Sequence, residues 1–196
     1  MVTMESTYAL DEGEEVPWFE LPGVDGETYT PDSFADSEAL LLVVTCNHCP
    51  YAQAKFDLLN RLAETYDAVA VVGVNPNDAE EYPDDSFEAM REYVDEGRVA
   101  YDAYLRDESQ ELAAALGAVC TPDPFLFRNE DGSFRLAYHG RLDDALNPED
   151  EPTRFQIREA IDAVLAGEDV DVDWEPSRGC SVKWLEGNEP DYWDEV

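Results

Sequence analysis

Positive charge is scarce in this sequence. Its 12 Lys and Arg residues are outnumbered by 47 Asp and Glu, so the formal net charge at pH 7 is −35, and the only lysines are Lys55 and Lys183. A surface of this sign repels nucleic acid phosphates and anionic lipid headgroups, and we therefore predict no nucleic acid and no membrane as partners. Because the acids are spread along the whole chain, we interpret them as the surface of a halophilic protein in a salt-rich cytoplasm, in preference to a docking surface for a basic partner.

Long apolar segments are also missing. No run approaches the roughly 18 residues that a membrane-spanning helix needs. Residues Met1–Val16 are acidic and contain no basic segment followed by an apolar one, which is not the pattern of a signal peptide, so we expect a cytoplasmic protein. The hydrophobic fraction of 44% nevertheless excludes a disordered acidic chain, and 196 residues suffice for one domain with a tail.

Several catalytic motifs are absent as well. The sequence has no glycine-rich phosphate loop, no GxSxG motif and no second histidine beside a nucleophile, so nucleotide and hydrolase chemistry have no support and we expect no cofactor. The residues left to carry chemistry are few: four cysteines and two histidines, namely Cys46, Cys49, Cys120, Cys180, His48 and His139.

Buried strands and amphipathic helices alternate along the chain. Ala39–Val44 and Ala68–Val74 are continuous apolar runs, typical of strands that are buried on both faces. Apolar residues recur at helical spacing between Tyr51 and Tyr66. Capping and turn signals predict the other elements: a hairpin within 17–30, helices at 85–97, 107–117 and 153–167, and strands at 124–127 and 134–139. This order predicts an α/β fold with a central mixed sheet and helices on both faces.

We divide the chain into a domain at 1–167 and a C-terminal tail at 168–196. The tail has no clear period, and we expect Trp174, Trp184 and Trp193 to pack it onto the domain. Residues 75–85 and 143–151 are acidic and are predicted to be surface loops, with Asp85 and Glu88 forming a capping box at the start of the next helix.

The segment Cys46-Asn47-His48-Cys49-Pro50 joins the first buried strand to the first helix. A CxxC motif at a helix N-terminus suits disulfide exchange, because the helix dipole stabilises the first thiolate and the second thiol can attack a mixed disulfide. We therefore assign Cys46 as the nucleophile and Cys49 as the resolving thiol. A positive charge on His48 is expected to lower the pKa of Cys46.

Two other interpretations of these cysteines are weaker. An inert buried pair does not suit a histidine and a proline at the edge of an element. Half of a zinc site would need further ligands from His48, His139, Cys120 or Cys180, and these lack a second CxxC or an HxxxH spacing. We predict no metal, and we keep a non-catalytic or metal-binding module as an alternative.

The chain resembles the redoxin branch of the thioredoxin fold, which includes the peroxiredoxins (AhpC/TSA) and the TlpA-like thiol-disulfide oxidoreductases. The resemblance runs from about residue 15 to 166. It rests on the TCNHCPY run at 45–51 and on Pro17-Trp18-Phe19, Asp25-Gly26, Thr121-Pro122, Asp131-Gly132 and Gly140-Arg141-Leu142-Asp143. It implies a thioredoxin-like fold and a thiol-disulfide oxidoreductase with an antioxidant role in cell redox homeostasis.

The resemblance also implies a substrate groove. Pro122 would be a cis-proline opposite the CxxC, and Thr121 would offer its backbone to an extended substrate. We assign Asn47, Pro50, Thr121 and Pro122 to this groove. The expected partners are protein or small-molecule thiols and disulfides, together with an electron donor that the sequence does not identify.

A peroxiredoxin-like thiol peroxidase is the first rival function. Peroxiredoxins carry a Thr or Ser three residues before the reactive cysteine and an Arg near the cis-proline position. Here these positions hold Cys46 and Pro122, which favours disulfide exchange, although Arg128 and Arg141 could still reach the site. The acid that thioredoxins carry six residues before the first cysteine is Leu40, so Cys49 needs another base, such as water or Asp123.

The other two cysteines and the second histidine are less constrained. Cys120 precedes Thr121 and is predicted to lie near the CxxC, most simply as a buried structural thiol. Cys180 could pair with Cys120 and pin the tail, or serve as a third relay thiol. His139 is expected on an edge strand, partly exposed.

Overall fold

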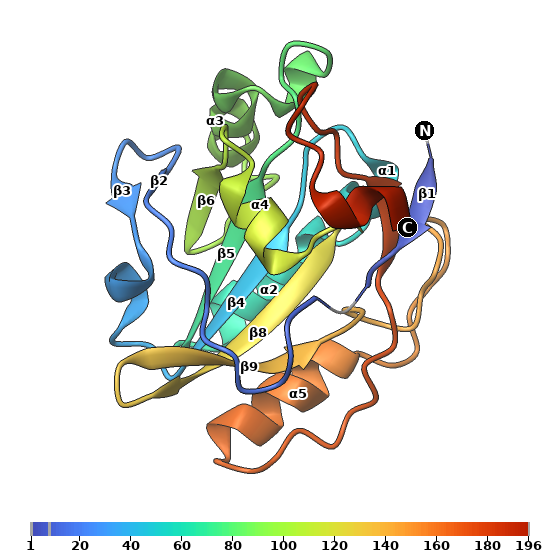
Figure 1. Cartoon of the computed structure of the whole chain (residues 1–196). Helices are drawn as coiled ribbons and strands as arrows, with labels where there is room; N and C mark the ends of the chain where they lie inside the picture. The colour runs from blue at the N-terminus through green and yellow to red at the C-terminus, as the bar shows by residue number, and fades with distance from the viewer. Residues whose placement is uncertain (1, 8, 196) are drawn as a thin grey trace.

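A mixed five-stranded sheet forms the centre of the protein (Figure 1). The computed structural model describes residues 2–7 and 9–195. The sheet has the order β6-β5-β4-β8-β9, with β4, β5 and β6 parallel and β8 and β9 antiparallel to their neighbours. Its strands are β4 (Ala39–Val44), β5 (Val69–Asn75), β6 (Ala103–Arg106), β8 (Asp123–Glu130) and β9 (Ser133–His139). The predicted central mixed sheet is confirmed, and β4 has the predicted bounds.

Both faces of the sheet are covered, because successive residues of β4 enter different clusters of the core. Leu41 packs in the cluster beneath α2 (Phe56–Thr65) and α5 (Gln156–Leu165). Leu40 packs on the other face with α4 (Glu111–Leu116), with β2 (Leu21–Pro22) of the hairpin, and with η1 (Pro31–Phe34). The predicted hairpin is confirmed by the pairing of β2 with β3 (Thr28–Tyr29).

The helix predicted from Tyr51 to Tyr66 is divided in two. α1 (Pro50–Gln53) ends before Ala54, and α2 begins at Phe56. The amide of Lys55 donates to the carbonyl of Ala52, which is a tighter i→i−3 bond than an α-helix uses. Apolar spacing cannot reveal such a single tight turn, since the buried residues keep the same side.

A second, three-stranded sheet was not predicted. It joins both ends of the chain in the order β1-β10-β7, all antiparallel, with β1 (Thr3–Glu5), β10 (Arg178–Ser181) and β7 (Cys120–Thr121) (Figure 1). β10 lies in the tail and is the central strand of this sheet. Trp174 and Trp184 pack the rest of the tail against the core, as expected. Strands of two to four residues leave too little pattern for a sequence to show.

Local caps differ from two expectations. Ser86, and not Asp85, caps α3 (Phe87–Asp95), because its hydroxyl accepts from the amide of Ala89. Asp85 ends the short η2 (Pro83–Asp85) and turns inward. Thr153 does not cap α5 but donates its hydroxyl to Asp144. Among the helices of residues 2–7 and 9–195, none has the length and apolar character needed to cross a membrane.

Candidate active site

The CxxC segment turns the chain from β4 into α1. Cys49 is the N-cap of α1 and Pro50 its first residue, a position that suits proline because the missing N–H would have no helical partner. Both Cys46 and Cys49 are reduced and fully buried. The start of the helix therefore lies at Cys49. The sequence had instead predicted that the helix dipole would stabilise the thiolate of Cys46.

The CxxC segment contacts a second segment, Thr121-Pro122, whose peptide bond is cis as expected. The Thr121 hydroxyl lies 3.1 Å from the sulfur of Cys46. The Cys49 thiol donates to the carbonyl oxygen of Thr121 over 3.5 Å. One residue thus contacts both sulfurs of the CxxC pair.

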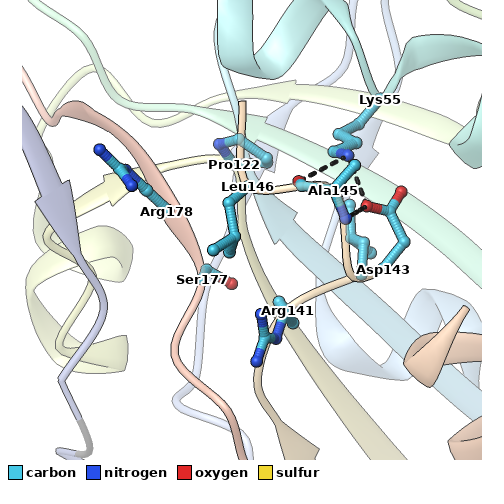
Figure 2. Close-up of a pocket in the computed structure, with 9 residues that line it drawn as sticks. Lys55, Pro122, Arg141, Asp143, Ala145, Leu146, Ser177 and Arg178 are labelled. Carbon is cyan, nitrogen blue, oxygen red and sulfur yellow. Dashed lines mark hydrogen bonds and ion pairs between the residues drawn. The ribbon is translucent and has the colours of Figure 1, made fainter. Parts of the chain in front are cut away.

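The edge of Thr121 is not open to an added substrate strand. It was predicted to offer its backbone to an extended substrate, but it pairs with Cys180 of β10. The tail strand occupies this position in the structure. Pro122 is buried, and it lines a small pocket with Ser177 and Arg178 (Figure 2).

That pocket also holds basic side chains, which are rare in this chain. Figure 2 shows Lys55 and Arg141 among the residues that line it. Lys55 donates to Asp143 over 2.6 Å, and Arg141 is ion-paired with Glu175. Each of these two positive charges is therefore paired with a carboxylate.

The pKa values of the two thiols shift in opposite directions, and the lowered pKa belongs to Cys49, not to Cys46 as expected. Burial raises the pKa of Cys46 well above its ordinary value, and the nearby charge of Asp85 adds to this effect. The pKa of Cys49 is far below its ordinary value, because as a thiolate it accepts hydrogen bonds from the thiols of Cys180 and Cys46 and from the amide of Ala52. These directions favour ionisation of Cys49 over ionisation of Cys46.

The ring of His48 lies near Cys46 and is held by a carboxylate. Its Nδ1 lies 2.5 Å from Oδ2 of Asp85, and its ring stacks on Tyr82 with centroids 4.7 Å apart. Asp85 thus lies close to both His48 and Cys46.

Asp85 is the central residue of this loop, and the sequence analysis missed it. Its carboxylate accepts from the amide of Asn47 (2.6 Å), from His48, and from the side chains of Asn75 (3.2 Å) and Asn77 (2.9 Å). Burial opposes the charge, but the bonds from His48 and Asn77 outweigh it and hold the pKa of Asp85 below its ordinary value. The predicted surface loop at 75–85 therefore contains buried residues that bind the CxxC turn. Two asparagines directly after a buried strand were the only signal of this in the sequence.

Asn47 also holds the loop and does not line a groove. It is fully buried, and its side chain donates to the carbonyl of Asp84 (2.8 Å) and accepts from the hydroxyl of Tyr104 (2.8 Å). Gln53 donates to its carbonyl over 2.6 Å. Pro50, by contrast, is exposed, as a residue in contact with substrate should be.

The structure brings three sulfurs together and keeps the fourth apart. Cys46, Cys49 and Cys180 belong to one buried cluster. In the β7–β10 pairing Cys180 is opposite Thr121, and Cys120 is opposite Ser181. Because successive residues of a strand point to opposite faces, Cys120 lies on the other face from Cys180, and this register does not fit the Cys120–Cys180 bridge that we considered.

His139 was predicted to be partly exposed but is fully buried. β9 is an edge strand, as expected, yet the His139 ring stacks on Phe125 and its Nε2 lies 2.9 Å from Asp123. Burial raises the pKa of Asp123, and burial followed by the charge of Asp123 raises the pKa of Cys120. Asp123 is therefore occupied by His139, which makes it a poor base for Cys49.

One group of potential metal ligands lies within the described ranges: Cys46, His48 and Asp85, whose ligand atoms are within 4.8 Å of one another. The carboxylate of this set already accepts five hydrogen bonds, from the amides of Asn47 and His48, from the His48 ring, and from the side chains of Asn75 and Asn77. A structural zinc site takes four ligands that are free to bind it, which this arrangement does not supply.

Two comparisons identify proteins that share this architecture. An uncharacterized conserved protein from Geobacillus kaustophilus superposes with a TM-score of 0.86 at 37% identity, over 94% of this chain and 97% of that one. The thioredoxin domain of a thiol-disulfide oxidoreductase from Bacteroides vulgatus superposes with a TM-score of 0.53 at 14% identity, over 67% and 91%. The thioredoxin-like fold is therefore confirmed.

Sequence comparison gives the family. The chain is similar to the thiol:disulfide interchange protein DsbE of Haemophilus influenzae, with 29% identity over 120 residues, and it spans 61% of that relative's length. A model of the AhpC/TSA family matches residues 13–138, which is more than half of the chain. Together with the paired thiols at the turn into α1 and the cis-proline beside them, this match shows that the chain belongs to the AhpC/TSA family.

Proposed function

We propose that this protein is a thiol-disulfide oxidoreductase in which Cys46 and Cys49 form the redox pair. The observation that carries the proposal is the contact of both sulfurs with Thr121, next to cis-Pro122. The similarity to a protein named thiol:disulfide interchange protein supports the same reaction. The substrates would be thiols and disulfides of proteins or small molecules, and the electron donor is not assigned.

The contacts suggest which cysteine attacks the substrate disulfide and which one resolves the mixed disulfide. Cys49 contacts Cys46, Cys180 and the carbonyl of Thr121, and we assign the first attack on an external disulfide to Cys46. Its proton passes to the Cys49 thiolate, which makes Cys46 the nucleophile. After one substrate thiolate leaves, Cys49 attacks the sulfur of Cys46, the second substrate thiolate leaves with the proton, and the Cys46–Cys49 disulfide remains. Because both sulfurs are fully buried, the surrounding segments must open for each exchange.

The family match gives some weight to a thiol peroxidase as the second function. The residues that would polarise a peroxide are not in place, however. Arg128 donates to the carbonyl of Glu168, and Arg141 is paired with Glu175. The position three residues before Cys49 is a thiol, not a Thr or Ser. We therefore rank hydroperoxide reduction below disulfide exchange, and rapid consumption of hydrogen peroxide would reverse this order.

An equilibrium redox titration at high salt tests the proposal, with free thiols counted by mass after alkylation. We expect a reversible two-electron couple that is lost in Cys49→Ser and kept in Cys120→Ser, the matched buried control. A potential near about −270 mV would make the protein a reductant, and one between about −180 and −120 mV an oxidant or isomerase. The absence of a reversible couple would contradict the proposal, and stoichiometric metal in the same sample would favour a metal-binding module.

A further inference from the structure

The tail strand β10 carries a cysteine into the redox site. Cys180 pairs with Thr121, the residue whose carbonyl accepts from Cys49 and whose hydroxyl contacts Cys46. Cys46, Cys49 and Cys180 share one buried cluster, and the amide and thiol of Cys180 both bind the sulfur of Cys49. Cys49 is thus the middle member of a chain of three sulfurs.

This approach depends on the residue before Cys180. A Cβ atom on Gly179 would lie 1.9 Å from the carbonyl oxygen of Thr121, so only glycine lets the two strands come this close. On its other side β10 is held by β1, where Thr3 pairs with Cys180. The strand is therefore fixed from both edges, which makes the position of Cys180 a built feature of the fold.

We propose that Cys180 is a third redox thiol, which exchanges with the Cys46–Cys49 disulfide to form a Cys49–Cys180 disulfide. This inference rests on the proposed function, which supplies the first disulfide. Cys180 attacks the sulfur of Cys49, the bond between Cys49 and Cys46 breaks, and Cys46 leaves and takes up the proton that Cys180 gave. The exchange is redox-neutral and needs no further oxidant.

The surroundings of Cys180 suit this attack once Cys49 is oxidised. In the reduced state the hydrogen bond to Cys49, burial and the charge of Cys49 raise the pKa of Cys180, whereas Lys183 lowers it. A Cys49 that is part of a disulfide carries no charge, so its raising effect disappears, while the effects of burial and of Lys183 stay. Cys120 has no such position, because its thiol contacts the carbonyls of Pro122 and Ser177 on the other face of β7.

The consequence is a second oxidised state with a different free thiol. With the disulfide between Cys46 and Cys49, the thiol left is Cys180. With the disulfide between Cys49 and Cys180, the thiol left is Cys46, the residue that attacks external disulfides in the proposed reaction. A molecule that stores one disulfide could then still form a mixed disulfide through Cys46.

Disulfide mapping of the full chain tests the inference. Wild-type protein would be treated with one equivalent of diamide, quenched in acid, alkylated and mapped by peptide mass. We expect both the Cys46–Cys49 and the Cys49–Cys180 linkages, with part of Cys46 alkylated. In Cys46→Ser we expect loss of two thiols and a Cys49–Cys180 linkage, with Cys120 alkylated. Cys46→Ala serves as a second variant, and circular dichroism checks the fold of both.

The outcomes separate the two proposals. If the folded Cys46 variants keep three free thiols, or if Cys120 enters the linkage, the role of Cys180 is overturned. Full alkylation of Cys180 in oxidised wild-type protein would overturn it too. In Cys180→Ser only the Cys46–Cys49 linkage is expected, and its absence there would contradict the proposed function instead. Cys120→Ser is the matched control and should give the wild-type linkages.

Discussion

Two aspartate–histidine pairs lie beside cysteines in this protein, and their carboxylates are held in opposite ways. Asp85 binds His48 next to Cys46, and Asp123 binds His139 near Cys120. Both carboxylates are fully buried. The pKa of Asp85 is nevertheless lowered, whereas the pKa of Asp123 is raised.

The number of hydrogen-bond donors explains the difference. Asp85 accepts from a backbone amide, two asparagine side chains and His48. Asp123 has fewer donors, namely His139 at Oδ1 and the backbone amide of Val119. A buried carboxylate stays charged only where donors replace the water that it lost. The comparison suggests that the charged carboxylate of Asp85 holds the CxxC turn, while the surroundings of Asp123 favour its neutral, protonated form.

The replacement Asp85→Asn should have the largest effect on stability. The amide group of the new residue would meet the donors of His48 and Asn77, so two charge-assisted hydrogen bonds of roughly 1.5 kcal/mol each would be lost, about 3 kcal/mol in all. Denaturation by urea at high salt measures this loss. Asp84→Asn is the matched control, because the neighbouring Asp84 side chain is exposed, and it should change stability by less than about 0.5 kcal/mol. Equal effects of the two replacements would refute a central role for Asp85.

The replacement Asp123→Asn should cost clearly less. The side-chain oxygen of asparagine can accept from His139 as Oδ1 does, and the raised pKa shows that the environment of Asp123 disfavours the charge. We expect a change of about 1 kcal/mol or less in the unfolding free energy. The same denaturation experiment measures it. A loss larger than that of Asp85→Asn would mean that donor number does not govern these two sites.

The pH dependence of the two variants should have opposite signs. The lowered pKa of Asp85 gives stability that is present above the ordinary value of 3.8 and is lost as the pH falls through the folded-state pKa. The raised pKa of Asp123 gives stability that is present below 3.8 and is lost as the pH rises through the folded-state pKa. The unfolding free energy that Asp85→Asn loses relative to wild type should become smaller as the pH falls below 3.8. The unfolding free energy that Asp123→Asn loses relative to wild type should become larger as the pH falls toward 3.8. Unfolding curves between about pH 3 and 6 would show this, and a common direction would contradict it.

The parts of the molecule that the sequence predicted are those with a local signature. Ala39–Val44 is a continuous apolar run, and it forms β4 with those bounds. The CxxC motif and Thr121-Pro122 are recognisable as short motifs, and they meet in the structure. The family and the thioredoxin-like fold followed from these motifs and the order of elements.

The parts that were missed depend on contacts between distant residues. Asp85 stands in an acidic stretch where any of several carboxylates could have turned inward, and only the fold shows that it meets Asn47. β10 is recruited by backbone pairing with Thr3 and Thr121, which leaves no periodic pattern in its side chains. The pKa order of Cys46 and Cys49 depends on Cys180, which is distant in sequence.

The smallest expected effect concerns the thiols beside the two carboxylates. Burial is the largest cause of the raised pKa of Cys46, and the charge of Asp85 adds to it, so Asp85→Asn should lower this pKa. Asp123→Asn should lower the pKa of Cys120 by the same mechanism and leave that of Cys46 unchanged. Alkylation rates of each cysteine as a function of pH, read by peptide mass, measure both values. If each replacement shifted both thiols alike, the change would reflect general loosening of the fold, and the two carboxylates would not act on separate cysteines.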